Sequence, residues 1–297
     1  MGNTATGNYS AIGGGVSNSV SGDYATIAGG FGNINSGFYA IVAGGRDNRN
    51  SGDFGCISGG IDHVVEGKWG TISGGFANTV KKKYGTIGGG TANTARGDFA
   101  SIQGGNDNTA GGIESSVGGG RSNTASAKWA NVGGGKDNVV TGRAAVIAGG
   151  RSNTASGQSA VVGGGYSNIA LGIGATVGGG GAVDIAEGNL AEGRFSVVAG
   201  GTGNSALGAY AIVAGGKNNF AGENHSVAVG SFARVEHEYA AVFGFRTDED
   251  LCYSMGDGTV SICAPNGLFL NERRIDQLTV NGSDTNALEL IHELNVT

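Results

Sequence analysis

A pattern of apolar, small and turn-forming residues recurs every fifteen positions from residue 7 to 180. A Gly-Gly pair closes each unit, and an Ile or Val stands two positions before that pair. A third column is asparagine, with His63 as its one substitute. Self-similarity at a fixed period is the signature of a repeat architecture in which each unit stacks on the next. The sequence therefore predicts an all-β solenoid with one coil per unit.

Each unit divides into strands and turns. In the segment YATIAGG (24–30), alternation predicts a strand with Ala25 and Ile27 pointing inward and Tyr24 and Thr26 pointing outward. The glycine pair permits a corner with positive φ. The Asn column marks a second corner, because asparagine tolerates the left-handed region and bonds its own backbone. We expect two short parallel strands and two or three tight turns per coil.

Composition limits how such a coil is stabilised. Glycine supplies 63 of 297 residues, and hydrophobic residues make up 39%. Each coil therefore buries only an Ile or Val and a small residue per strand pair, which is a thin core. Repeat proteins gain stability by stacking neighbours, and this one would gain further by burying a second face between chains. We expect an oligomer, and specifically a homotrimer.

The charge and the apolar runs argue against two classes of partner. The formal net charge of -6 does not favour nucleic acid, which usually needs a basic face. No apolar run approaches the roughly 18 residues of a membrane-spanning helix, so we expect no membrane span. The first ten residues lack the charged and apolar regions of a secretory signal. Action outside a cell would therefore need another route, such as virion assembly, or a removed segment.

The segment SVAVGSFARVEHEYAAVFG (226–244) carries a Ser-x-Ala-x-Gly-x-x-Ala pattern that returns after fourteen residues at Gly244. This pattern resembles the head repeats of YadA-type trimeric autotransporter adhesins. The fifteen-residue units are similar to those repeats in their order of Ser/Ala, Ile/Val, Gly and Asn, so the resemblance covers about residues 1–245. It implies a left-handed parallel β-roll in which three chains wind around one axis, and an adhesive function.

Two features depart from that family. The main period is fifteen rather than fourteen, with a Gly-Gly corner that adhesin heads do not generally show. A long coiled-coil stalk and a membrane anchor are also missing from the sequence. A phage or eukaryotic-virus fibre protein with the same roll is therefore an equal alternative, and NGLFLNERRIDQL resembles strands that precede the base of phage-type tail fibres. We expect an extracellular, cell-surface or virion-surface location.

The repeat is interrupted once and then ends. A register break at 181–194 carries about five or six extra residues, and the unit resumes at Phe195. An insertion in a solenoid maps to a loop on one face. Because the composition changes after residue 245, we expect a repetitive domain over 1–245 and a cap or trimerisation module over 246–297.

The expected cap module contains a hairpin and a helix. The segment LCYSMGDGTVSIC predicts a β-hairpin with Asp257 and Gly258 in its two-residue turn. That register pairs Cys252 with Cys263 at a distance compatible with a disulfide, although the sequence leaves open whether they are bonded. The last segment, SDTNALELIHELNVT, has apolar residues at helical spacing and predicts a short helix.

An outward column of aromatic residues is the main candidate binding surface. Its rings could form a platform for sugar rings, or they could pack against another chain, since aromatic pairs gain about 0.5–1.5 kcal/mol beyond area burial. Acidic residues in the register break are a second candidate. The candidate ligand-binding residues are Tyr24, Tyr39, Phe54, Trp69, Tyr84, Phe99, Trp129, Asp184, Glu187 and Glu192.

The chain shows no nucleophile-elbow sequence and no spaced metal cluster, so we expect no catalytic residue, metal or cofactor. His237 between Glu236 and Glu238 is more typical of a charged surface than of an ion site. The leading hypothesis is an adhesin-like fibre that binds a host-surface glycan or a matrix protein. The alternative is a fibre-borne polysaccharide lyase or glycosidase, whose chemistry would need paired carboxylates. Ice binding by a threonine column is a third possibility, but a second aligned column is interrupted.

Overall fold

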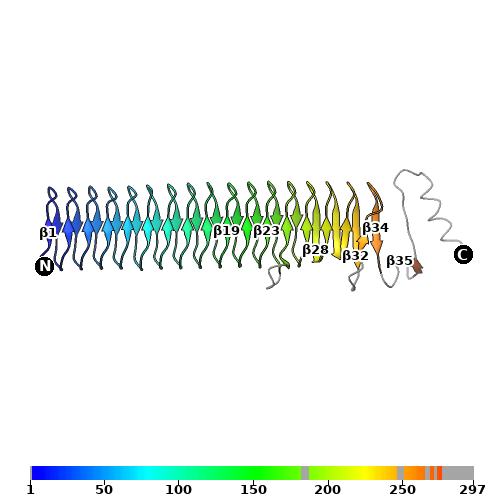
Figure 1. Cartoon of the computed structure of the whole chain (residues 1–297), viewed down its shortest axis with the longest axis horizontal. Helices are drawn as coiled ribbons and strands as arrows, with labels where there is room; N and C mark the ends of the chain where they lie inside the picture. The colour runs from blue at the N-terminus through cyan, green and yellow to red at the C-terminus, as the bar shows by residue number, and fades with distance from the viewer. Residues whose placement is uncertain (1, 182–186, 246–250, 265–267, 271–272, 276–297) are drawn as a thin grey trace. The chain divides into compact units, whose positions relative to one another are not determined.

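The computed structural model describes residues 2–181, 187–245, 251–264, 268–270 and 273–275. It divides into two compact units, residues 1–164 (unit 1) and 165–297 (unit 2). In each unit the odd-numbered strands as far as β33 pair in parallel and form sheet A, and the even-numbered strands as far as β34 form sheet B (Figure 1). Each coil gives one strand to each sheet, which confirms the predicted all-β parallel solenoid.

The strands of unit 1 are each two residues long, shorter than the predicted alternating segments. Sheet A of unit 1 consists of β1 (Thr4–Ala5), β3 (Ser19–Val20), β5 (Ile34–Asn35), β7 (Arg49–Asn50), β9 (Val64–Val65), β11 (Thr79–Val80), β13 (Thr94–Ala95), β15 (Thr109–Ala110), β17 (Thr124–Ala125), β19 (Val139–Val140) and β21 (Thr154–Ala155). Sheet B of unit 1 consists of β2 (Ala11–Ile12), β4 (Thr26–Ile27), β6 (Ile41–Val42), β8 (Cys56–Ile57), β10 (Thr71–Ile72), β12 (Thr86–Ile87), β14 (Ser101–Ile102), β16 (Ser116–Val117), β18 (Asn131–Val132), β20 (Val146–Ile147) and β22 (Val161–Val162).

Unit 2 repeats this arrangement with longer strands towards its end. Its sheet A consists of β23 (Ile169–Ala170), β25 (Leu190–Ala191), β27 (Ser205–Ala206), β29 (Phe220–Ala221), β31 (Ala233–Val235) and β33 (Cys252–Tyr253). Its sheet B consists of β24 (Thr176–Val177), β26 (Val197–Val198), β28 (Ile212–Lys217), β30 (Val227–Ser231), β32 (Ala241–Phe245) and β34 (Val260–Cys263). A separate antiparallel pair is formed by β35 (Leu268–Leu270) and β36 (Arg273–Ile275).

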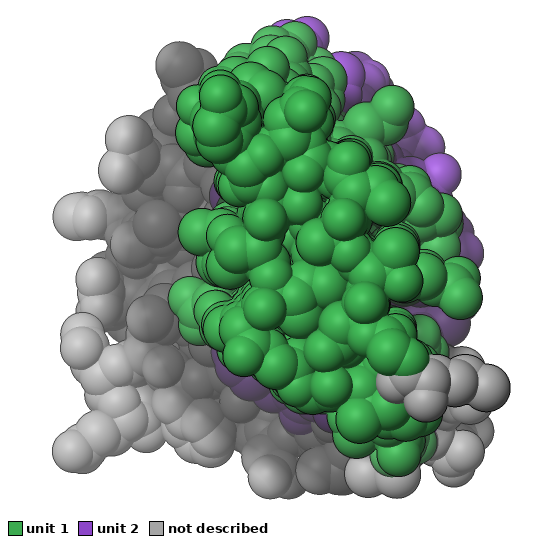
Figure 2. All heavy atoms as spheres, turned by 90° about the vertical axis from the view of Figure 1, so that its left-hand side faces the viewer, with its two compact units in different colours: residues 1–164 green, residues 165–297 purple. Residues whose placement is uncertain are grey.

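The pairing register turns every sequence column into a row of stacked residues. In unit 1, Thr26 pairs with Ile41 and Ile27 with Val42, fifteen residues on in each case. The end-on view in Figure 2 shows the coils of unit 1 eclipsing one another. In unit 2, Ile169 pairs with Leu190, which is 21 residues on, so one coil holds six extra residues without a shift of register. This agrees with the five or six extra residues expected from the sequence.

The core lies between the two sheets and is as thin as the composition implied. From the second coil onward the inward Ile/Val column and the small-residue column are both buried, as Ile27 and Ala25 show with 0% exposure. The inward residue of sheet A, such as Val20 or Val80, closes the opposite wall. The predicted inward set is therefore confirmed. Close packing of small side chains suits this narrow space, because any added methylene would need room that the facing wall occupies.

A ladder of buried asparagine side chains lines one corner of the coils. The Asn108 Nδ2 donates to the carbonyl oxygens of Gly104 at 3.1 Å and Gly120 at 3.0 Å. Its Oδ1 accepts from the backbone N–H of Asn123 at 3.0 Å, and its own N–H donates to the Oδ1 of Asn93. One carboxamide thus joins three consecutive coils. Such buried backbone groups need partners, and the asparagine supplies them.

The asparagine column does not itself take the left-handed conformation expected from the sequence. The residue before it does, as in Asp107 with φ 56° and Asp137 with φ 56°. The second glycine of each pair also has positive φ, for example 92° at Gly105, as predicted. Turning at the preceding residue directs the amide inward, where it can reach the glycine carbonyls.

His63 interrupts this ladder. Its Nδ1 accepts from the Asn78 N–H at 3.1 Å, while its Nε2 is buried without a hydrogen-bond partner. A neutral imidazole has one N–H and so cannot serve two carbonyl groups as an Asn amide does. Burial lowers the pKa of His63, and the negative charge of Asp62 offsets part of that shift.

The predicted hairpin at 251–263 is wrong. β33 pairs in parallel with β31, and β34 pairs in parallel with β32, so the two segments add one more coil instead of pairing with each other. The reason is that the preceding coil offers two unpaired strand edges. Gly258, with φ 68°, still lies in the turn between them.

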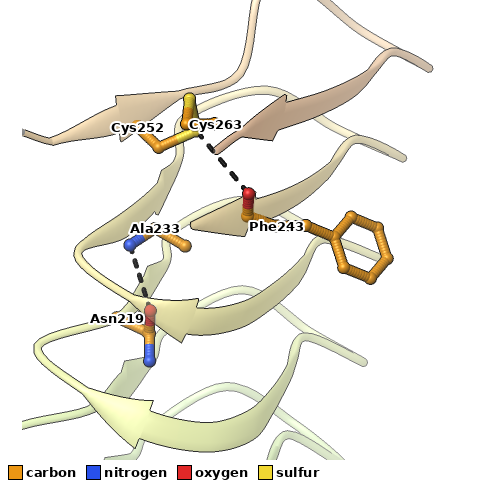
Figure 3. The surroundings of a disulfide bond; sticks show 5 residues. All are labelled: Asn219, Ala233, Phe243, Cys252 and Cys263. Atoms are coloured by element: carbon orange, nitrogen blue, oxygen red, sulfur yellow. Dashed lines mark hydrogen bonds between the residues drawn. A yellow bond between two sulfur atoms is a disulfide. The ribbon is translucent and has the colours of Figure 1, made fainter. Parts of the chain in front are cut away.

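Cys252 and Cys263 are joined by a disulfide with a Cα–Cα distance of 5.8 Å. Figure 3 shows this bond linking the last described strands of the two sheets, above Ala233, whose N–H donates to Asn219 Oδ1 and ends the asparagine ladder. A covalent link therefore follows where the carboxamide ladder stops. The predicted boundary at residue 246 stays a prediction, and the expected terminal helix lies outside the described residues.

The asparagine ladder gives a first prediction. Asn108→Ala leaves the carbonyls of Gly104 and Gly120 and the N–H of Asn123 without these partners, and each buried unsatisfied group costs about 1–3 kcal/mol. We expect the free energy of unfolding to fall by at least about 2 kcal/mol in chemical denaturation. The control is Asn106→Ala, an exposed asparagine of the same turn, expected within about 0.5 kcal/mol of wild type. Equal effects of the two variants would contradict the ladder's role.

A second prediction concerns pH. Because the folded pKa of His63 lies below its usual 6.5, the unfolded chain binds more protons at acidic pH. Its contribution to stability is therefore present above pH 6.5 and is lost as pH falls from there through the lowered folded pKa.

His63→Asn should raise the thermal midpoint and flatten its dependence on pH below 6.5. The measurement is thermal unfolding followed by circular dichroism across this range. The control, compared in its pH dependence and not in its midpoint, is His225→Gln, which replaces an exposed imidazole. A profile for His63→Asn as steep as that of wild type would argue against the buried histidine as its source.

Candidate functional site

A continuous stack of aromatic rings runs along the turns of unit 1. Neighbouring ring centroids lie 4.5 to 5.6 Å apart, with interplanar angles between 3° and 15°. We call this set the aromatic ladder. Its members are Tyr9, Tyr24, Tyr39, Phe54, Trp69, Tyr84 and Phe99. The structure thus brings together six of the seven predicted aromatic residues and adds Tyr9.

The ladder residues lie in turns and not on strands, which corrects the outward strand position predicted for Tyr24. Each has a left-handed backbone, with φ 57° at Tyr24 and 52° at Tyr39. The cause is the short strand: the sheet B strand of that coil consists of Thr26 and Ile27 alone, so the chain is still reversing at Tyr24. The N–H of Tyr24 donates to the carbonyl of Asn8 at 2.8 Å, which fixes the turn on the preceding coil.

Stacking offsets the strain of these turns. A bulky residue in the left-handed region costs on the order of 1–2 kcal/mol, and an aromatic pair returns about 0.5–1.5 kcal/mol. The rings cover one another's faces, so what remains exposed is mainly their edges. From Tyr24 to Phe99 the exposure is 39–50%, whereas Tyr9 at the free end is 81% exposed.

Polar groups border the ladder at particular coils. The Asp23 Oδ1 accepts from the Asn8 N–H at 2.8 Å, so this carboxylate stabilises a turn. The Lys68 Nζ lies 4.3 Å from the centroid of Trp69 and 5.5 Å from that of Phe54. This cation–π contact places a positive charge beside the middle of the ladder.

Trp129 stands apart from the ladder, because Glu114 occupies the coil between it and Phe99. Its Nε1 donates to Glu114 Oε2 at 2.9 Å. The Lys128 Nζ lies 4.0 Å and the Arg143 Cζ 4.7 Å from the Trp129 centroid. The seventh predicted residue is therefore a separate feature, held by cations and a carboxylate.

The acidic candidates do not form a described carboxylate pair. Glu187 precedes β25 and Glu192 follows it, so they flank the two ends of this strand. The Glu187 carbonyl accepts from the Gly203 N–H at 3.0 Å, which makes its backbone part of the solenoid corner. Asp184 lies outside the described residues. Glycosidases hold their two carboxyl groups facing each other across the bond that is cleaved, and the acidic site expected from the sequence stays a prediction.

Unit 2 holds a second aromatic stack that the sequence analysis missed. Its members are Phe195, Tyr210, His225 and Tyr239, with centroid distances between 4.9 and 5.5 Å. The signal was present, since each residue precedes a buried Ala or Ser of the small-residue column. The six extra residues of the preceding coil shifted the numbering and hid the continuation.

Other polar groups are already engaged by neighbours. Glu236 pairs with Arg234 at 2.7 Å, and the His237 Nδ1 lies 2.6 Å from Ser254 Oγ. Within the described residues, no three His, Cys, Asp or Glu side chains are grouped so that they could hold a metal ion. The same described residues contain no helix long and apolar enough to cross a membrane.

A hollow of about 360 Å³ lies at the other turn of the coils in unit 1. It is lined by Gly32, Asp47, Arg49, Asp62 and Val64. The Asp47 carboxylate also contacts the Arg46 guanidinium at 3.6 Å. Opposite charges in an open, solvated hollow compensate one another, so this feature gives weaker grounds for a ligand than the ladder does.

Comparison with family models finds no match, and no curated protein matches the chain.

The strain and stacking of the ladder give a third prediction. Tyr84→Ala removes the stacking on Trp69 and Phe99 and leaves a Cβ in the left-handed region, whereas Tyr84→Gly removes only the stacking. We expect both variants to be less stable than wild type, with the Gly variant more stable than the Ala variant by about 1 kcal/mol. Denaturant unfolding of the three proteins measures this. An Ala variant as stable as the Gly variant would show that the turn carries no strain.

Proposed function

We propose that the chain is an adhesin-like attachment fibre that binds a host-surface glycan along the aromatic ladder of unit 1. The observation that carries this proposal is a row of half-exposed ring edges repeated once per coil. Parallel strands repeat at about 4.8 Å, so the row offers one similar contact at each step. A polysaccharide also repeats along its length, so a single glycan chain would meet several rings at once.

The chemistry of the ladder suits such a ligand. Ring faces are covered by stacking, so the contacts are made by ring edges and by the hydroxyl groups of Tyr24, Tyr39 and Tyr84. A phenol hydroxyl both donates and accepts hydrogen bonds, as sugar hydroxyls do. Lys68 adds a cation beside Trp69, which would favour a glycan that carries carboxylate or sulfate groups. Many weak contacts along one polymer add up through effective concentration.

The proposed fibre is a homotrimer that acts at an extracellular, cell or virion surface. The thin core supports an oligomer, because a second buried face would add to the small apolar area within each coil. The resemblance of residues 226–244 to YadA-type head repeats supports three left-handed rolls around one axis. A matrix protein is the other target class consistent with an exposed aromatic row.

A glycan array with purified protein tests the proposal. We expect binding to acidic polysaccharides, with affinity that rises steeply with chain length, as multivalency requires. Phe54→Ala, in the middle of the ladder, should weaken binding about tenfold, which corresponds to roughly 1.4 kcal/mol.

The matched control is Phe76→Ala at the other turn of the coil, where the ring is 46% exposed compared with 40% at Phe54. This variant should bind as wild type does. Failure to bind any glycan, or equal losses for Phe54→Ala and Phe76→Ala, would reject the ladder as the glycan site. Binding to a matrix protein that Phe54→Ala abolishes would move the proposal to the other target class.

A further inference from the structure

The outer face of sheet B in unit 2 is apolar across consecutive strands. We call it the apolar face, and define it by Ile212, Val227, Val229, Phe243, Val260 and Ile262. These side chains alternate with buried residues such as Val213 and Ala228, so they point away from the coil. Ile212 is 42% exposed, Ile262 44% and Val260 57%.

The described strands of sheet B in unit 2 carry one charged residue, Lys217 at the end of β28, and the six residues of the apolar face are all uncharged. The outer side of sheet A in the same unit differs, since it carries Glu192, Arg234 and Glu236. Exposed strand surfaces ordinarily carry charges that prevent association. Exposed apolar surface without charge is typical of a face that another molecule covers.

Unit 1, taken by itself, shows a related feature. The outward residues of its sheet B strands run from Ala11 on β2 to Val161 on β22 without a charge. The next outward position in each coil is Gly, Ala or Ser, except at Gln103. Small residues beside a row of short and β-branched residues leave a flat surface that a second sheet could approach closely.

We infer that sheet B is the face through which this chain packs against a second copy of itself. An uncharged face is complementary to another uncharged face, and the same chain supplies one. Strands lie about 4.8 Å apart and residues along a strand about 3.3 Å apart. At these spacings the outer face of sheet B in unit 1 and that in unit 2 have a summed area of roughly 800 Å² per copy. That is the share each partner contributes to a standard interface.

The inference rests on the self-association proposed above but not on glycan binding. It assigns the contact to sheet B and leaves the aromatic ladder at the turns available to a ligand. Cys56 provides an intrinsic probe, because it is the unbonded cysteine on β8 of the same sheet and is half-buried in the single chain. Association should shield it further.

Sedimentation equilibrium of the full chain tests the inference. Wild type should exceed the single-chain mass of 29.2 kDa. Ile212→Lys and Val260→Lys, which place a charge on the apolar face, should raise the dissociation constant at least tenfold and increase the maleimide reactivity of Cys56. Circular dichroism confirms that each variant folds.

The matched control is Ile169→Lys on β23, an isoleucine of sheet A that is 37% exposed, and it should keep the wild-type mass. A wild-type mass of 29.2 kDa would overturn both the oligomer and this contact. An oligomer that survives Ile212→Lys and Val260→Lys, or that Ile169→Lys dissociates equally, would overturn the contact alone. If wild type is a single chain that binds ice or crystalline polysaccharide, and Ile212→Lys abolishes that binding, the face would be assigned to a crystalline ligand instead. Loss of glycan binding with an intact oligomer would leave this inference standing.

Discussion

The fold depends on how the glycine corners satisfy their carbonyl groups. A corner built from Gly-Gly leaves part-buried backbone oxygens facing the asparagine column, and the buried asparagine amides donate hydrogen bonds to them coil after coil. Asn108 donates to Gly104 in its own coil and to Gly120 in the next, so closing one turn also fixes its neighbour. This double role explains why one residue type is repeated so strictly. It also explains why His63, with a single ring N–H, leaves a local defect.

The same stacking geometry produces the surface. Because equivalent residues repeat at the spacing of parallel strands, aromatic rings in one column necessarily meet face to face, and they offer their edges to the outside. Attraction between rings offsets strain in the turn backbone, although the turn keeps its left-handed conformation without rings, as at Ala144 and Ser159. A column is consequently stable as a group, and a break such as Glu114 separates Trp129 from the rings before it.

The sequence predicted the features that follow from the repeat pattern within one coil and missed those that depend on contacts between coils. Period, parallel strands, and the inward Ile27 and Ala25 follow from local pattern, and so does the positive φ at Gly105. Tyr24 was misplaced because a two-residue strand is too short for alternation to extend to it. The buried role of Asn108 depends on the carbonyl of Gly120, twelve residues away. The strands on either side of Asp257 and Gly258 pair with strands of the previous coil. The stack at Phe195 and Tyr210 was hidden by the longer coil before it.

The longer coil also says something about how this architecture can change. Ile169 and Leu190 keep their pairing although six more residues separate them than in other coils, so the corner tolerates added chain while the ladder of hydrogen bonds stays in register. The pairing of strands in the sheets therefore does not depend on the length of the segment that connects them. A scaffold with this property can acquire new surface segments by insertion at a corner without any change in its core packing. Each coil is an equivalent place for such an insertion. The repeat is in that sense a modular platform for diversification.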